Sequence, residues 1–407
     1  MGESHSPGEW DVIVVGAGLA GLQCATTLSE LRPDLRICLM DGQDETGGSA
    51  RWAVGSFTAG GTKWQARAGI GDSTSEHYEE LVGMCGLDPG AADGARHRAL
   101  LRGMCAAGPA MLEELEARGV RFAGPFLEAP HSRPRMHNVV PRASAVAEAL
   151  EAAVRQAGVT ILTGAAGDMV DIGRQADGGL AVRTQSGPHR GAAVVLASGD
   201  TSATHPVVPG VNPGSLGGPM RLAAAKLGAR VHRARLVPGL RTTSPGKAFV
   251  APAGELVSRG SFVLPHGERQ RGDAVLADLE AFAGQDLYLE VDLKAVPADL
   301  QVCTYPAQGY GTMPDLVRDG LAVAVAGEGG APSVAIGPMR VLVTLADGGL
   351  DVRESMQVLS ADGTPVEGVY SCGSAALGRI RLGGHGHHLL WAVFSGAVAA
   401  RTLAGRR

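Results

Sequence analysis

Three glycines near the start of the chain have the spacing of a phosphate-binding turn. Gly16, Gly18 and Gly21 form a G-x-G-x-x-G run that follows four consecutive apolar residues and opens a stretch with helical periodicity through Leu28 and Leu31. In such a turn the first glycine permits a tight bend, the second lets a pyrophosphate approach the backbone, and the third lets the helix pack closely on the strand. Because the helix also aims free N–H groups at the phosphates, the run predicts a dinucleotide site.

An acidic residue stands where a bound dinucleotide needs one. The apolar residues 36–40 predict a second strand, and Asp41 ends it, twenty residues after Gly21. A carboxylate at this point accepts hydrogen bonds from the ribose hydroxyls and disfavours a 2′-phosphate. Strand, glycines, helix, strand and acid in this order predict a βαβ unit that binds a dinucleotide.

Tyrosine residues in the second half of the chain offer proton chemistry. Tyr305 and Tyr310 flank Gly309, and a tyrosine can donate a proton to a carbanion or an enolate. Two surface tyrosines in a loop are the alternative interpretation. His131 and His137 lie in a segment with three prolines, for which we expect an irregular loop near the surface and no metal site, because no further ligand stands at a suitable spacing.

Composition limits the classes of partner. The net charge of −5 and the absence of a dense Lys/Arg run argue against nucleic acid or an anionic membrane, so a small-molecule substrate is expected. No stretch approaches about 18 uninterrupted apolar residues, and the first ten residues lack the features of a secretory signal. Six scattered cysteines without C-x-x-C spacing predict buried, reduced thiols and a cytoplasmic location.

The 407 residues allow two or three domain-sized units, or one large α/β domain with an insertion. A helical pattern is expected over 73–125, followed by a helix over 143–156 and a strand over 159–162. From about residue 231 to 343, prolines, turn pairs and short alternating strands replace this rhythm, which predicts a smaller inserted domain.

Two glycine-rich segments carry a resemblance to a known family. Gly47-Gly48-Ser49 directly follows the βαβ unit, with Gly55 six residues after Ser49. Near the other end, Pro365-Val-Glu-Gly-Val-Tyr370 leads into a glycine-rich turn and a final helix. Both segments resemble the FAD-binding flavoprotein family of fumarate reductase, succinate dehydrogenase and 3-ketosteroid dehydrogenase. They bracket almost the full length of the chain.

The resemblance implies an α/β fold: a Rossmann-like, glutathione-reductase-type FAD-binding domain with an inserted smaller α+β substrate-capping domain. The implied boundaries are 9–232 and 345–407 for the FAD-binding domain and 233–344 for the capping domain. FAD is expected to be non-covalent, because Ser49 stands where membrane-bound members attach it through a histidine. The expected FAD-binding residues are Gly16, Gly18, Ala20, Gly21, Asp41, Gly42, Gly48, Ser49, Val54, Gly55, Ala166, Ser198, Gly199, Gly373, Ser374, Gly384, His388 and Leu389.

The family also suggests catalytic residues. Arg381 occupies the position of an arginine that grips a substrate carboxylate in fumarate reductases, and a planar bidentate donor also suits a polarised carbonyl. The last helix begins near His387 and is expected to point its positive end at the flavin edge that becomes negative on reduction. Glu255 and Arg259 stand where the family carries a Glu/Arg proton relay, and Tyr310 is a further candidate. The ligand types in His385-Gly-His-His also suit a metal cluster, but the resemblance places this turn at the flavin, so no metal is expected.

These features predict an FAD-dependent oxidoreductase that transfers hydride to or from a carbon next to a carbonyl-type group, by C–C desaturation or ene reduction of a small molecule. The electron donor or acceptor is left open. Two alternatives remain: an amine or amino-acid oxidase of the same architecture, and a non-catalytic flavin-binding subunit of an electron-transfer complex.

Overall fold

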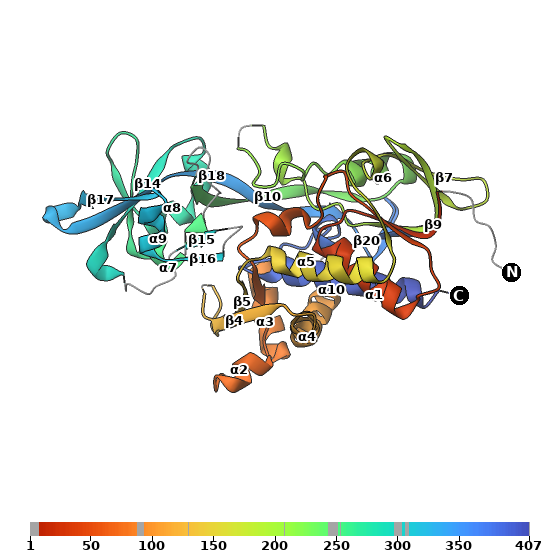
Figure 1. Cartoon of the computed structure of the whole chain (residues 1–407), viewed down its shortest axis with the longest axis horizontal. Helices are drawn as coiled ribbons and strands as arrows, with labels where there is room; N and C mark the ends of the chain where they lie inside the picture. The colour runs from red at the N-terminus through yellow and green to blue at the C-terminus, as the bar shows by residue number, and fades with distance from the viewer. Residues whose placement is uncertain are drawn as a thin grey trace.

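The chain folds into a larger and a smaller part that are joined by two long strands (Figure 1). The larger part contains both ends of the chain, and the smaller part is built from its middle. This computed structural model describes residues 8–87, 93–128, 130–206, 208–242, 251–252, 254–296, 303–305 and 309–406.

A parallel sheet forms the centre of the larger part. The last four residues of its first strand, β1 (Glu9–Val15), are apolar and buried, and β1 pairs in parallel with β2 (Ile37–Met40) on one side and β9 (Gly187–Leu196) on the other. The carboxyl ends of β1 and β2 therefore bring the glycine turn and Asp41 to the same edge of the sheet. In spatial order the sheet is β19 (Gln357–Leu359), β20 (Pro365–Ser371), β9, β1, β2 and β6 (Thr160–Leu162), with β7 (Met169–Arg174) and β8 (Leu180–Thr184) as an antiparallel extension beside β9.

Helices cover this sheet. In Figure 1, α1 (Leu19–Leu31), α5 (Ser144–Gln156) and α10 (His387–Ala404) lie side by side, and α1 contacts both of the others. Further helices of this part are α2 (Lys63–Arg67), α3 (Thr74–Cys85), α4 (Gly94–Ala117) and α6 (Gly218–Leu227). The expected extent of α1 through Leu31, the expected bounds of α5 and the expected start of α10 agree with the structure to within two residues.

Two expectations about residues 73–142 were wrong. The helical pattern does not continue to residue 125, because β4 (Arg121–Phe126) pairs with β5 (Met136–Val140) in a small sheet that also contains β3 (Ser56–Thr58). His131 and His137 are buried, not near the surface. Hydrogen bonds allow this burial: His131 Nδ1 bonds to Glu80 Oε1 at 2.9 Å, and His137 Nε2 bonds to Thr62 Oγ1 at 2.9 Å.

The smaller part is built on a second, antiparallel sheet. The long strands β10 (Val231–Thr242) and β18 (Pro332–Leu350) run from the larger part into it. A separate hydrophobic core, from Leu240 to Val341, falls inside the expected capping range 233–344. The remaining elements are β11 (Ala251–Pro252), α7 (Gly254–Arg259), β12 (Ser261–Val263), β13 (Arg269–Arg271), α8 (Gly272–Ala277), β14 (Leu287–Asp292), β15 (Cys303–Tyr305), β16 (Gly309–Gly311), α9 (Met313–Arg318) and β17 (Ala322–Ala326).

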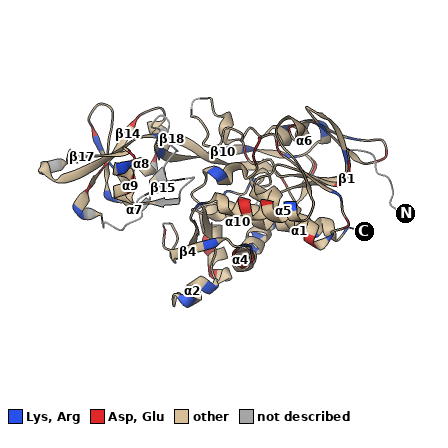
Figure 2. Cartoon of the chain, in the orientation of Figure 1, with Lys and Arg blue, Asp and Glu red and all other residues tan. Residues whose placement is uncertain are grey.

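The surface has no strong separation of charge. Figure 2 shows Lys and Arg interspersed with Asp and Glu in both parts of the molecule. None of the described helices combines the length and hydropathy that a bilayer crossing requires.

Helices α1 and α10 approach each other closely enough to depend on one glycine. A Cβ atom on Gly396 of α10 would overlap the carbonyl oxygen of Ala20 in α1. By contrast, a Cβ atom on Gly83 in α3 would meet nothing within 4 Å.

We therefore predict that Gly396→Ala lowers the free energy of unfolding by about 1–3 kcal/mol, because the two helices must separate. The matched control Gly83→Ala should raise it by about 0.5–1 kcal/mol, as expected for alanine in an open helical position. Urea unfolding of the two variants measures both values. Equal effects of the two substitutions would contradict the close packing.

Candidate functional site

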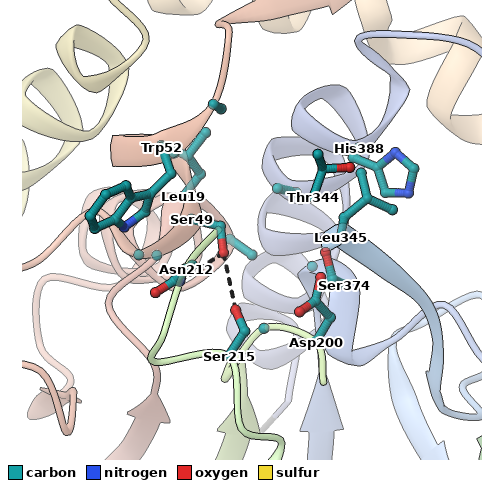
Figure 3. A pocket seen from close by; sticks show the side chains of 18 of the residues that line it. Leu19, Ser49, Trp52, Asp200, Asn212, Ser215, Thr344, Leu345, Ser374 and His388 are labelled. Carbon is teal, nitrogen blue, oxygen red and sulfur yellow. Dashed lines mark hydrogen bonds between the residues drawn. The ribbon is translucent and has the colours of Figure 1, made fainter. Parts of the chain in front are cut away.

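A large cavity, of about 1060 Å³, opens where the parallel sheet meets the bases of β10 and β18. Its walls come from segments far apart in the sequence (Figure 3). Leu19, Ser49 and Trp52 lie on one side of the view, with Thr344 and His388 on the other. The volume suits a ligand of cofactor size.

The glycine turn forms one end of this cavity. Gly16 has a φ of 111°, and a Cβ atom there would overlap the carbonyl oxygen of Ala197. At Gly18 the nearest atom to an added Cβ would be Gly48 Cα, 3.9 Å away, so the space beside this residue is open. Helix α1 begins at Leu19 without a side-chain cap, which leaves its first N–H groups available to a phosphate.

Gly21 has the packing role that the glycine pattern predicts. A Cβ atom at this position would overlap the carbonyl oxygen of Gly16, so only glycine lets α1 lie this close to the turn. Gly21 itself lies beneath the turn and does not line the cavity.

Asp41 lines the cavity at the end of β2. Its Oδ2 accepts a hydrogen bond from the backbone N–H of Ala17 at 2.7 Å, and its Oδ1 accepts one from Gln43 N–H at 2.8 Å. Burial raises the pKa of this carboxyl above its ordinary value. Each oxygen retains a further lone pair, so the carboxylate can also accept hydrogen bonds from ribose hydroxyls.

A loop that the sequence did not single out closes over this end. Asn212 Nδ2 donates to Ser49 Oγ at 2.9 Å, and its Oδ1 accepts from Gln43 Nε2 at 3.2 Å. Ser49 Oγ also lies 3.4 Å from Ser215 Oγ (Figure 3). Asn212 therefore ties together three segments of the cavity wall. Its only sequence signal was an Asn-Pro-Gly-Ser turn.

One buried polar atom in the wall points to a ligand. Ser198 Oγ is buried and has no hydrogen-bond partner among the residues that the structure describes, yet Ser198 lines the cavity. An orphaned hydroxyl of this kind costs free energy unless a bound molecule satisfies it.

Three arginine side chains line another part of the cavity, which we call the chamber. Arg381, on the glycine turn before α10, is exposed there and makes no ion pair or side-chain hydrogen bond within the described residues. Arg235 and Arg241, both on β10, line the same part. Burial lowers the pKa of Arg241 to about 10, still high enough for a charged side chain at neutral pH. Neither β10 arginine was expected, because the sequence does not show which face of a long strand turns inward.

The geometry thus combines a glycine turn at the N-terminus of α1, a carboxylate at the end of β2 and an arginine-lined chamber. The family model described as FAD binding domain matches residues 11–387. The chain belongs to this FAD-binding family. The cofactor and the family expected from the sequence are confirmed.

Solved structures share the whole fold. A flavocytochrome c3 fumarate reductase in an open conformation aligns with a TM-score of 0.73 and 18% identity, over 98% of this chain and 79% of that chain. The 3-ketosteroid-Δ4-(5α)-dehydrogenase of Rhodococcus jostii RHA1 aligns with a TM-score of 0.67 and 19% identity, over 99% of this chain and 98% of that chain. These likenesses confirm the expected fold class of an FAD-binding domain with a capping domain.

Curated relatives match only in part. A KsdD-like steroid dehydrogenase of Mycolicibacterium smegmatis is 38% identical over 78 residues, which are 19% of this chain and 14% of that protein. An L-aspartate oxidase of Agrobacterium fabrum is 32% identical over 174 residues, which are 40% of this chain and 30% of that protein. The matched regions span less than a third of either relative.

Most of the residues expected to bind FAD line the cavity. Gly21 and Ala166 do not; Ala166 lies in a short turn whose neighbours Gly167 and Asp168 reach the wall instead. The expected residues at the wall are Gly16, Gly18, Ala20, Asp41, Gly42, Gly48, Ser49, Val54, Gly55, Ser198, Gly199, Gly373, Ser374, Gly384, His388 and Leu389. Their direct contacts with FAD stay predictions.

His387 lies behind the cavity rather than in its wall. It is buried, its Nδ1 lies 2.5 Å from the carbonyl oxygen of Gly383, and its Nε2 lies 2.8 Å from Nε2 of His77. His77 Nδ1 in turn accepts from the N–H of Gly60. These partners define a chain of two neutral rings: His77 donates to His387, which donates to Gly383. Burial lowers the pKa of His387 to about 3 and lowers that of His77 far below its ordinary value.

The structure therefore does not support direct catalysis by His387. Its hydrogen bond to the Gly383 carbonyl instead stabilises the glycine turn before α10. Arg259, in the capping part, is exposed in α7 and does not line the cavity either. Glu255 and Tyr310 belong to α7 and β16, and their side chains lie outside the described residues. Among the described side chains of the five expected catalytic residues, that of Arg381 alone reaches the chamber.

We predict that Ser198→Ala lowers the affinity for FAD by about threefold to tenfold, the loss expected for one hydrogen bond. The apo-protein should be as stable as the wild type, or slightly more so, because the hydroxyl has no partner to lose. Titration of apo-protein with FAD and urea unfolding measure the two effects.

Ser202→Ala is the control for the serine prediction. Ser202 Oγ donates to Asp200 Oδ1 at 2.7 Å, so its removal should cost about 1–2 kcal/mol of apo-protein stability. Unchanged FAD affinity in Ser198→Ala would contradict the proposed contact.

The neutral histidine pair predicts a pH dependence of folding. Both imidazoles bind protons below about pH 6.5 in the unfolded chain but stay neutral in the fold, so the unfolded state takes up more protons as the pH falls. Stability should therefore decrease on acidification from pH 6.5 toward 4. His387→Gln should reduce that decrease by about 1.4 kcal/mol per pH unit, the effect of one proton. Urea unfolding at several pH values measures the slope.

The control for this pH dependence is His266→Gln, in an exposed pair with Glu268. It should keep the wild-type slope. An unchanged slope in His387→Gln would show that His387 is protonated in the fold.

Proposed function

We propose that the protein is an FAD-dependent oxidoreductase that transfers hydride to or from a carbon next to a carbonyl-type group of a small molecule, by C–C desaturation or ene reduction. The observation that carries this proposal is the guanidinium of Arg381 in the chamber at the end of the FAD cavity. Without a partner among the described residues, it is available to a carbonyl or carboxylate oxygen.

FAD, when bound, supplies the hydride acceptor or donor. The protein's own residues bind and orient. Arg381 holds the activating oxygen of the substrate, so that negative charge developing on that oxygen is stabilised. The buried pair of His77 and His387 fixes the Gly383 carbonyl and with it the turn that carries Arg381. The bases of β10 and β18 form the outer wall and reduce access of water.

The names of the structural relatives support this reaction class, because a fumarate reductase and 3-ketosteroid dehydrogenases both act next to carbonyl groups. We further propose that FAD is bound without a covalent link: Ser49, which replaces the attachment histidine of membrane-bound members, is hydrogen-bonded to Asn212. Five buried cysteines with free thiols support our proposal of a reducing, cytoplasmic location.

Oxidation of an amino acid is a second candidate. The match to an L-aspartate oxidase favours it, and Arg381 would suit the carboxylate of such a substrate equally well. Hydrogen peroxide released with amino acids, and no change of the flavin spectrum with ketones or enones, would identify this activity.

We predict that saturated ketones or related carbonyl compounds bleach the flavin absorbance of the anaerobic holoenzyme, and that Arg381→Met slows this reduction about 100-fold or more. Stopped-flow absorbance measures the rate. FAD content and reduction by dithionite should stay as in the wild type, because Arg381 acts on the substrate.

The matched control is Arg379→Met, two residues earlier on the same segment. Arg379 is exposed, bonds to His232 Nδ1 at 3.3 Å and does not line the cavity. This variant should be reduced at the wild-type rate. Equal rates in both variants would contradict the role of Arg381.

A separate measurement tests the non-covalent binding of FAD: acid precipitation of the protein should release FAD into the supernatant.

A further inference from the structure

Two imidazoles reach the cavity from the turn that opens α10. His385 bonds through Nδ1 to Glu128, and His388 bonds through Nε2 to Asp347 Oδ1 at 2.8 Å. The two pairs differ in exposure: the side chain of His385 is 70% exposed, whereas those of His388 and Asp347 are 15% and 6% exposed. Only the second pair is a desolvated histidine–carboxylate pair in the cavity wall, where electrostatic interactions are strong.

The free atom of His388 is its Nδ1. A carboxylate only accepts, so the hydrogen bond to Asp347 requires the proton on Nε2. Nδ1 then has a lone pair and no hydrogen-bond partner within the described residues. The His388 ring can therefore accept a second proton at Nδ1 without breaking its hydrogen bond to Asp347.

Besides the His385–Glu128 pair, three charged or titratable groups lie near His388 and Asp347. Arg235 of β10 lies opposite Asp347 in the strand register, and a guanidinium does not change its charge in the physiological range of pH. Burial raises the pKa of Cys85 in α3 to about 11, with a contribution from Asp347, so this thiol stays protonated. Next along α10, the low pKa of His387, about 3, keeps that ring neutral.

The cavity fixes which end of FAD lies near His388. Gly18 and Asp41 line the cavity beside Leu19, the first residue of α1, whereas His388 and Thr344 lie across the cavity from Leu19. FAD is extended, so its ring system belongs on the side of His388. Two-electron reduction by a hydride places one negative charge on that ring, and the positive end of α10 favours such a charge.

We propose that His388, held by Asp347, takes up one proton from water at Nδ1 when the bound FAD is reduced, and returns it on reoxidation. The inference rests on the FAD binding of the proposed function and not on the identity of the substrate. The balance is complete: the substrate's hydride supplies two electrons and one proton to FAD, and water supplies the proton that turns imidazole into imidazolium. No other bond changes.

The test is the pH dependence of the reduction potential of the holoenzyme, titrated anaerobically with dithionite and reference dyes from pH 5 to 9. The wild type should show a range of pH in which the potential falls with the slope of two protons for two electrons. In His388→Gln the slope should fall by half, to one proton for two electrons, throughout that range. An identical two-proton range in both proteins would overturn the proposal.

His385→Gln is the matched control, because it removes the other cavity imidazole, and it should keep the two-proton range. If His388→Gln does not retain FAD, the variant Asp347→Asn tests the proposal instead. The asparagine oxygen of this variant can still accept the hydrogen bond from His388 Nε2, but the negative charge that favours imidazolium is removed. The pH range with the two-proton slope should therefore move to lower pH. A range that stays in place in Asp347→Asn would also overturn the proposal.

The titration separates this inference from the proposed function. Dithionite reduces the flavin whatever the natural substrate is, so the difference in slope between the wild type and His388→Gln does not depend on that substrate. Failure of every carbonyl compound to bleach the flavin would contradict the reaction class and leave the slopes as measured.

Discussion

The close approach of α1 to the end of β1 is the constraint on which the cofactor site depends. Without any Cβ at Gly21, the first turn of α1 lies against the carbonyl of Gly16, and the free N–H groups of the helix face the cavity. Helix α10 then packs on α1 through Gly396. The N-termini of both helices thus meet one cavity, where their positive potential favours an anionic ligand.

What the sequence predicted well is what is decided locally. The glycine spacing, the strand before it and Asp41 lie within one βαβ unit, so their relation in space follows from short connections. The two adjacent histidines show the limit of such reasoning. Successive residues of a helix point about 100° apart, so His387 faces the buried His77 while His388 faces the cavity. The packing of α10 against α1 and α4 sets that phase.

The parts that sequence reasoning missed depend on contacts between distant segments. Asn212 matters because its loop returns to Ser49, and Asp347 matters because β18 runs beside the start of α10. His131 looked like a surface residue because its neighbours are polar and proline-rich. It is buried with one ring nitrogen bonded to Glu80, which Arg135 also contacts, while Nε2 has no partner among the described residues. Composition records polarity, but it does not record which polar groups will pair.

Two adjacent histidines of α10, His387 and His388, have different electrostatic surroundings. His387 is bonded to another imidazole and to a carbonyl oxygen, so nothing near it repays the cost of desolvating a charge, and the ring stays neutral. His388 is bonded through Nε2 to the carboxylate of Asp347, and its Nδ1 has no hydrogen-bond partner among the described residues. A neutral His387 adds no repulsion against an imidazolium at the next residue. The turn that carries Arg381 is thus hydrogen-bonded on one side to an uncharged histidine pair, while His388 on its other side lines the cavity.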